Sequence, residues 1–477
     1  MKDRALTLIG LAAALVVPLG AAPPNAQPGP AKGVEWAPRL GAALADAESE
    51  GRVVLLALGA AGEGRTAHHV KALYPAKDAT AAFAATVNVP AWSFAPDDER
   101  ELPKLSGVTP DDFRMNLAEI TERWIAPNDS GAVPLPHHVW LDPKGEVLLS
   151  CPWEIDALEL AWCTDEALRR AGIEARPDLP EGAHAPRRLV VGATTRVGDA
   201  DPLGRGLVPG ELDEEIGELN KRFLAWSDRF SVTRILFTDD DDAADFIAQK
   251  IGLWDIGQDA TAGLLDGVIG LGGVLSTAAH VEMFEDAAKS NRKSRRAQGA
   301  VALENLGRPE GLAIAKKAWK KEKDSAVRAE WARALGACGR GQASIAKTLV
   351  RAAKKERDSR VRRGAILGLG HVLPEPSARS FLEDTVREGA GLEREAAILA
   401  LALGREREAR ATVAAVRESG LDVEPSTADV VGAALEVLDG ANLHVLEDDV
   451  ARVSESELPR ARLFFRASRG IELLRPR

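Results

Sequence analysis

The chain has 477 residues, of which 45% are hydrophobic, and it carries a formal net charge of −11. That length exceeds what one hydrophobic core supports, so we expect two or three domains. The three cysteines exclude a complete disulfide framework.

The N-terminus has the pattern of an export signal. Basic Met1–Arg4 precedes the 15-residue apolar run Ala5–Leu19, and the small residues Gly20–Ala22 follow. We expect a signal peptide over 1–22 that is cleaved after Ala22, with an uncleaved anchor as the alternative. No later stretch is long and apolar enough to span a bilayer, so we expect no transmembrane segment after cleavage. The protein is then exported, periplasmic or extracellular, and a Pro/Gly-rich spacer covers 23–33.

The segment 34–173 alternates helical and strand patterns, which is an α/β order. The expected elements are a helix through Leu40–Ala47, strands at Val53–Leu58 and Val87–Phe94, helices at His68–Leu73 and Glu154–Ala171, and a hairpin over Pro134–Ser150 with a turn at Asp142–Gly145.

Several motifs of this segment resemble the thioredoxin-like superfamily over about 34–172. The motifs are Trp36, Ala43-Leu44-Ala47 leading to Glu50-Gly51-Arg52, the strand Val53–Leu58, Pro136, and the run Val139–Val147. The resemblance implies a thioredoxin-like fold. It places Glu63 and Thr66 where the family has its two reactive cysteines, so it implies a redox-inactive module.

Pro136 matches the proline that the family holds in cis beside its active-site loop. The resemblance implies that this loop forms a groove able to grip an extended peptide. The alternative is that Pro136 only terminates a strand.

Two cysteines of this segment, Cys151 and Cys163, flank Trp153 and could close a disulfide loop in an exported protein. The alternative is that both are small buried hydrophobic residues. The third cysteine, Cys338, falls in a repeat helix, where we expect packing.

Four histidines form two adjacent pairs, His68-His69 and His137-His138, and on a thioredoxin-like frame the pairs face each other. Neighbouring residues diverge on a helix or a strand, so at most one from each pair could reach a shared metal. Two ligands make a weak site, and we expect no metal. Nucleophile-elbow, metalloprotease and phosphate-loop motifs are missing from the sequence, and we expect no catalytic residue and no cofactor.

A Pro/Gly/Arg/Asp-rich linker is expected over 174–210, and helical patterns occupy 211–477. Leu-Gly recurs at 271–272, 306–307, 335–336, 369–370 and 403–404, and Lys320–Arg328 returns almost unchanged as Lys354–Arg362, 34 residues later. A fixed period of this size predicts a solenoid of stacked helix pairs. We expect a helix at 261–271 before the repeats, and helices at 427–438 and 458–467 as a C-terminal cap.

Within these repeats, the pattern D..VR..A...LG resembles HEAT repeats over about 255–420. The matching residues are Asp324, Val327, Arg328, Ala332, Leu335 and Gly336, then Asp358, Val361, Arg362, Ile366, Leu369 and Gly370. The resemblance implies that the aspartates and arginines bond between successive repeats, that the apolar residues pack inside, and that glycine ends the helix.

Charge is unevenly distributed, because Arg292–Arg363 holds 21 Lys/Arg against seven Asp/Glu. We expect the second helices of two consecutive repeats to align their basic residues into a stripe, although a solvated face is the simpler alternative. The basic residues concerned are Lys316, Lys317, Lys320, Lys321 and Lys323, then Lys347, Arg351, Lys354, Lys355 and Arg357.

These features favour an exported, non-enzymatic scaffold that binds another protein, one that is acidic if the stripe takes part. Nucleic acid is not expected as a partner after export. The alternative is a thiol- or metal-dependent enzyme, a relative of thioredoxin-like oxidoreductases, that uses the solenoid as a substrate platform.

Overall fold

The structure is a computed structural model that describes residues 34–127, 133–186, 188–194, 205–221, 228–254, 269, 280–373, 375–418 and 425–455. The expected signal peptide, the spacer, the helix at 261–271 and the last expected helix at 458–467 lie outside these residues. Within the described ranges, none of the helices combines the length and apolar character that a bilayer crossing requires.

The first part is an α/β domain whose elements follow the expected order. Its helices and strands are α1 Leu40–Glu50, β1 Val53–Ala60, α2 Gly64–His68, α3 Lys77–Ala84, β2 Thr86–Ser93, α4 Pro110–Arg123, β3 His137–Leu141, β4 Val147–Pro152, α5 Ala157–Arg170 and β5 Val190–Val191.

The strands form one mixed sheet in the order β2-β1-β3-β4-β5. The central strand β1 runs parallel to β2 and antiparallel to β3, and every residue of β1 is buried. Its unbroken apolar sequence follows from this position, because both faces of a central strand are covered. The short strand β5 pairs with β4 and comes from the segment that we expected to be a linker.

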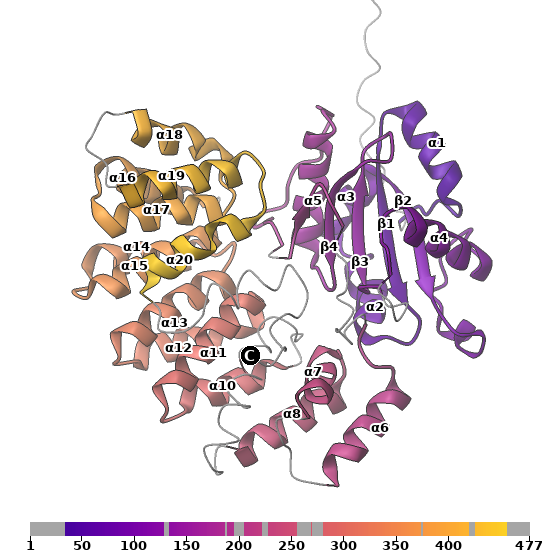
Figure 1. The fold of residues 1–477 in the computed structure, drawn as a ribbon, viewed down its shortest axis with the longest axis horizontal. Coiled ribbons are helices and arrows are strands. Elements are labelled where there is room, and N and C mark those ends of the chain that lie inside the picture. The colour runs from indigo at the N-terminus through magenta and orange to yellow at the C-terminus, as the bar shows by residue number, and fades with distance from the viewer. Residues whose placement is uncertain are drawn as a thin grey trace, which may run out of the picture. The chain divides into compact units, whose positions relative to one another are not determined.

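Helices cover both faces of the sheet (Figure 1). On one face, Leu40, Ala43 and Ala47 of α1 and Ile120 of α4 pack on alternate residues of β1 and β3. On the other face, α3 and α5 bury their apolar residues against the remaining ones. The α/β class is therefore confirmed for this domain.

The rest of the described chain is helical. Its helices are α6 Pro209–Asn220, α7 Arg229–Phe237, α8 Asp241–Trp254, α10 Val281–Lys289, α11 Lys293–Leu306, α12 Leu312–Lys321, α13 Ser325–Cys338, α14 Ala343–Lys355, α15 Ser359–Leu369, α16 Pro376–Glu388, α17 Gly391–Leu403, α18 Arg410–Glu418, α19 Pro425–Leu438 and α20 Glu447–Ser454.

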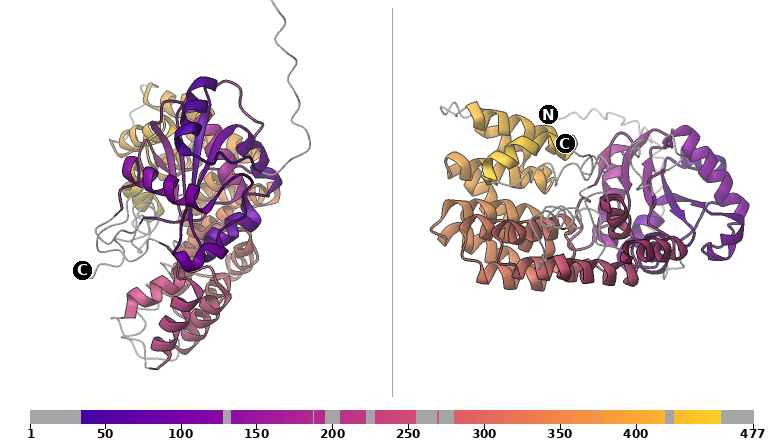
Figure 2. Two further views of the ribbon diagram at one scale, coloured as in Figure 1. Left: turned by 90° about the vertical axis from the view of Figure 1, so that its right-hand side faces the viewer. Right: turned by 60° about the horizontal axis from the view of Figure 1, so that its bottom comes forward.

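From α10 onward the helices stack in pairs, as the period predicts (Figure 2). The inner layer is α11, α13, α15, α17 and α19, each packed on the next, and the other helix of each pair lies beside it. Trp331, Leu335, Ile366 and Leu367 are among the buried residues of this core.

Within the described residues, the recurring glycines end helices, as the HEAT resemblance implies, except for Gly336. Gly307, Gly370 and Gly404 directly follow α11, α15 and α17. Gly336 instead lies inside α13, and a Cβ there would come within 2.1 Å of the Gly368 carbonyl oxygen. Gly336 therefore lets α13 and α15 approach backbone to backbone.

Candidate binding groove in the helical repeats

Successive repeats are joined by an arginine–glutamate ladder. An arginine early in one inner helix pairs with a glutamate just before, or early in, the next inner helix, at 2.7 Å each time. The three pairs are Arg296–Glu322, Arg328–Glu356 and Arg362–Glu393. The ladder thus uses Arg328 and Arg362 as the resemblance implies, but its acids are glutamates that sequence reasoning missed.

The repeat aspartates cap their own helices and also reach the preceding repeat. Asp324 accepts hydrogen bonds from the amides of Ala326 and Val327 at the start of α13, and its other oxygen lies 3.1 Å from Lys293 Nζ. Asp358 caps α15 and is hydrogen-bonded by Ser325. These contacts hold the pKa of both carboxyls below the ordinary value, because they stabilise the ionised form against its desolvation.

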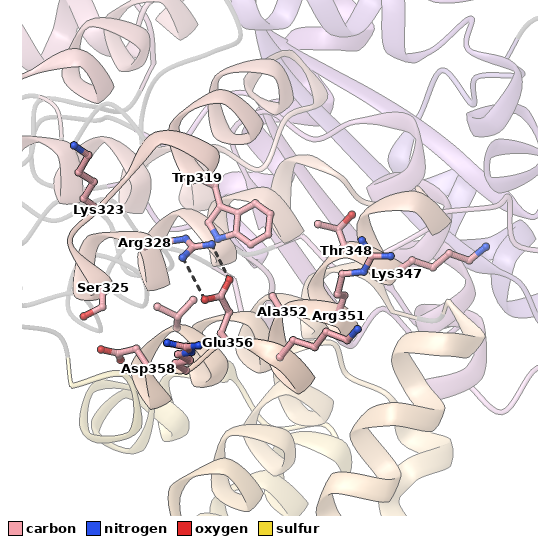
Figure 3. A pocket seen from close by; sticks show the side chains of 13 residues that line it. Trp319, Lys323, Ser325, Arg328, Lys347, Thr348, Arg351, Ala352, Glu356 and Asp358 are labelled. Atoms are coloured by element: carbon pink, nitrogen blue, oxygen red, sulfur yellow. Dashed lines mark hydrogen bonds and ion pairs between the residues drawn. The ribbon is translucent and has the colours of Figure 1, made fainter.

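A groove of about 790 Å³ opens between α12 and α14 (Figure 3). α12 packs on α10 and α14 packs on α16, but α12 and α14 do not pack on each other to a comparable extent. The side chains that line the groove come from α12, α13, α14, the start of α15 and the turns between these helices: Trp319, Lys323, Ser325, Arg328, Lys347, Thr348, Arg351, Ala352, Lys355, Glu356, Arg357, Asp358 and Val361.

Positive charge in this groove is largely uncompensated. The ladder neutralises Glu356 by pairing it with Arg328 (Figure 3). Within the described part of the chain, the remaining cations of the lining have no ion-pair partner: Lys323, Lys347, Arg351, Lys355 and Arg357. Three of them, Lys347, Arg351 and Lys355, recur every four residues and so form one row along α14.

The wall opposite this row is aromatic. Trp319 of α12 is half-buried, and the Arg328 guanidinium lies 5.5 Å from its ring centroid. The lining therefore combines an aromatic surface and a row of cations.

Only part of the expected stripe lines this groove. Lys316, Lys317, Lys320 and Lys321 on α12 and its end, and Lys354 on α14, are exposed but outside the lining, whereas Lys355 lies inside it. Two of the outer lysines have local partners. Lys317 Nζ lies 3.1 Å from Glu285, and Lys354 Nζ lies 5.4 Å from the Phe381 ring centroid. A tryptophan within the lysine-rich α12 was the signal that could have predicted the aromatic wall.

In the α/β domain, the loop after β1 is built around Glu63. Glu63 is fully buried, and its carboxylate accepts hydrogen bonds from the amides of Arg65 and Thr66 and from the Thr66 hydroxyl. Burial raises the pKa of Glu63, against the effect of these hydrogen bonds. The Leu135–Pro136 peptide bond is cis, as expected from the resemblance.

The open peptide groove that we expected beside this loop is absent among the described residues, because the chain itself covers the loop. A Cβ on Gly64 would lie 2.1 Å from the Asp239 carbonyl oxygen, and a Cβ on Gly206 would lie 2.6 Å from Glu63 Oε1. The guanidinium of Arg65 lies 3.9 Å from the ring centroid of Phe237 at the end of α7. Segments that follow the α/β domain therefore fill this space.

One histidine of the first pair contacts one histidine of the second pair. The rings of His69 and His138 are buried with centroids 5.2 Å apart, whereas His137 points to the opposite face and bonds Ser150. No third metal-ligating side chain joins His69 and His138 within the described ranges.

A different group, Asp156, Glu159 and His184, has ligand-like spacing, but its two carboxylates already face a cation. Arg308, at the turn before α12, lies 2.6 Å from Asp156 and 3.7 Å from Glu159. The charge of Arg308 holds the pKa of Glu159 well below its ordinary range, despite burial. The two acidic members of the group are therefore already partnered by the guanidinium.

All three cysteines are free and buried in the structure, so Cys151 and Cys163 are not joined. Burial raises the pKa of both thiols well above the ordinary value. Cys338 packs in the repeat core, as expected.

Residues 323–402 match the family model for HEAT repeats. This match covers α13 to α17 and most of the groove lining. The curated proteins include no match to the chain. HEAT repeats indicate a protein-interaction scaffold.

Proposed function

We propose that this protein is an exported, non-enzymatic scaffold that binds a protein partner in the groove between α12 and α14. The observation that carries the proposal is the row of Lys347, Arg351 and Lys355 without ion-pair partners among the described residues, facing Trp319 across a groove of about 790 Å³. Exposed single charges are common on solvated helices. Several unpaired cations around an aromatic residue in a concavity are typical of a recognition site.

We further propose that the α/β domain is a redox-inactive thioredoxin-like module. The mixed sheet with helices on both faces and the cis Leu135–Pro136 bond support this assignment. Glu63 and Thr66, which stand at the dithiol positions, serve as a helix cap and its partner. The leader pattern of residues 1–22 supports export.

The rival hypothesis, a thiol- or metal-dependent enzyme, has less support from the site geometry. A reactive cysteine needs a lowered pKa and access to substrate, and burial works against both at Cys151 and Cys163. The Asp156, Glu159 and His184 group holds Arg308 instead of an exchangeable ligand position.

The proposal is tested by two charge-matched triple variants of the full chain. Lys347→Glu/Arg351→Glu/Lys355→Glu changes the groove, and Lys316→Glu/Lys320→Glu/Lys321→Glu makes the same charge change outside it. Each is immobilised and exposed to proteins of the native cell envelope. We expect the groove variant alone to lose a partner that the wild type captures. Identical capture by wild type and groove variant would refute the assignment of the groove.

A further inference from the structure

We infer that the groove binds an extended acidic segment of the partner, with carboxylates at alternate positions. This inference rests on the proposed function and adds the chemistry and the conformation of what is bound. It follows from the spacing of the cations, the packing of α12 and α14 on α13, and the character of the two walls.

The cation row has a spacing that an extended chain matches. Lys347, Arg351 and Lys355 are four residues apart on α14, and a rise of 1.5 Å per residue puts them about 6 Å apart along the helix axis. In an extended segment, side chains on one face recur every second residue, about 6.6–6.8 Å apart. Three alternate carboxylates therefore meet three successive cations, and flexible lysine and arginine side chains absorb the small difference.

The packing of α12 and α14 favours an extended segment over a helix. The two helices belong to the same layer and both pack against α13, and packed helices have axes about 8–10 Å apart. A helix inserted between α12 and α14 in that layer would need about this distance to each of them, and they reach such a separation only on opposite sides of α13. An extended segment needs no such place in the layer, because one backbone sends alternate side chains to the two walls.

The two walls of the groove differ in chemistry, and an extended segment can contact both of them. Successive side chains of an extended chain point to opposite sides. When the acidic positions face Lys347, Arg351 and Lys355, the intervening positions face α12 and the turn after it, where Trp319 offers an aromatic surface and Lys323 a cation. The best occupant thus alternates acidic residues with residues that include an apolar or aromatic one.

Fluorescein-labelled synthetic peptides test this inference by anisotropy with the full chain. One peptide alternates Glu with Ser and carries a central Phe at a non-acidic position. A second has the same composition with its glutamates contiguous. A third places the same number of glutamates at four-residue spacing in a lactam-stapled helix. Heparin and inorganic polyphosphate serve as competitors.

We expect the alternating peptide to bind at least about tenfold more tightly than the other two, since each lost ion pair weakens binding severalfold. Its affinity should fall steeply between 0.05 and 0.3 M salt, given a Debye length of about 10 Å at 0.1 M. The groove triple variant should lose this binding, whereas the Lys316/Lys320/Lys321 variant should keep it. Trp319→Ala should weaken the Phe-containing peptide and leave an all-Ser version unchanged.

Three results would overturn the inference. They are equal affinity for the three peptides, tighter binding of the stapled helix, and complete displacement by heparin or polyphosphate at equivalent charge, which would indicate a general polyanion site. Failure of the peptides is distinguishable from failure of the proposed function. If the groove variant still loses the captured partner while no peptide binds, the groove remains the interface and only the extended acidic segment is wrong.

Discussion

Removal of the buried Glu304 carboxylate should destabilise the repeats more than almost any other single change. Arg333 of α13 holds this carboxylate in a bidentate pair, with its Nη2 at 2.9 Å and its Nε at 3.1 Å, and His371 Nε2 lies 2.9 Å from it. The Glu304 and Arg333 side chains are 0% and 1% exposed. The three residues lie on consecutive repeats, so Glu304→Ala leaves a guanidinium buried among apolar helices without its counter-charge.

Loss of one member of a buried ion pair costs about 3–5 kcal/mol. With a urea dependence of about 3 kcal/mol per molar, that cost lowers the unfolding midpoint by about 1–2 M. The measurement is urea unfolding of the full chain, followed by circular dichroism at the helical band. Glu285→Ala is the matched control. Its ion pairs with Lys289 and Lys317 are solvent-exposed, and exposed pairs contribute about 0.2–1 kcal/mol.

A double variant tests whether the uncompensated charge of Arg333 causes the loss of stability. Glu304→Leu/Arg333→Met removes both charges and keeps apolar volume, so it should recover most of the stability that Glu304→Ala loses. A loss below about 1 kcal/mol for Glu304→Ala, or a double variant as unstable as the single one, would refute the reasoning that an uncompensated charge is responsible.

Further predictions concern thiols, caps and pH. The protein should not accelerate disulfide reduction by dithiothreitol, and Cys151 and Cys163 should react with iodoacetamide only after denaturation, because burial raises their pKa; catalysis lost on replacing either cysteine would contradict this. Asp358→Ala should lower stability in urea unfolding by about 0.5–2 kcal/mol through loss of the cap, and a change of a few tenths would show that the carboxylate is only solvated. Burial lowers the pKa of His137 and of His138 to about 3. In the unfolded chain the histidine pKa is near 6.5, so between pH 6.5 and about 3 the unfolded state binds more protons than the folded state. The free energy of unfolding therefore falls as pH is lowered through this range, by up to about 1.4 kcal/mol per pH unit for each histidine. Melting temperatures at pH 7.5 and 5 should show this loss, and His138→Phe should reduce it; an unchanged difference would place the titration elsewhere.

Features that depend on local periodicity could be predicted from the sequence. The run at Val53–Leu58 became the buried strand β1, and Asp142–Gly145 became the hairpin turn, with Gly145 at a φ of 85°. The repeat period predicted the stacked helix pairs of the solenoid. Each of these features depends on a few neighbouring residues whose pattern matches a strand, a turn or a helix.

Features that depend on distant segments could not be predicted in this way. Nothing in the sequence around Glu63 indicates that Phe237 and Asp239 cover its loop. The groove could not be predicted without knowing which basic residues face the α12–α14 gap. Residues three and four apart both share a helix face, so helical spacing alone does not separate Lys354 from Lys355, which lie three and four residues after Arg351. The position of Arg308 among Asp156 and Glu159 joins residues about 150 positions apart, as its hydrogen bond to Asp156 shows.

The cover over the Glu63 loop also affects how this protein could be divided or recombined. A fragment that ends after β5 would lose Phe237 and Asp239 and would expose Arg65 and Trp153, which are buried in the whole chain. The α/β domain is consequently not closed by its own residues alone, because Phe237 and Asp239 complete its surface. Gene fusion or truncation at that boundary would have to replace the lost cover with another chain.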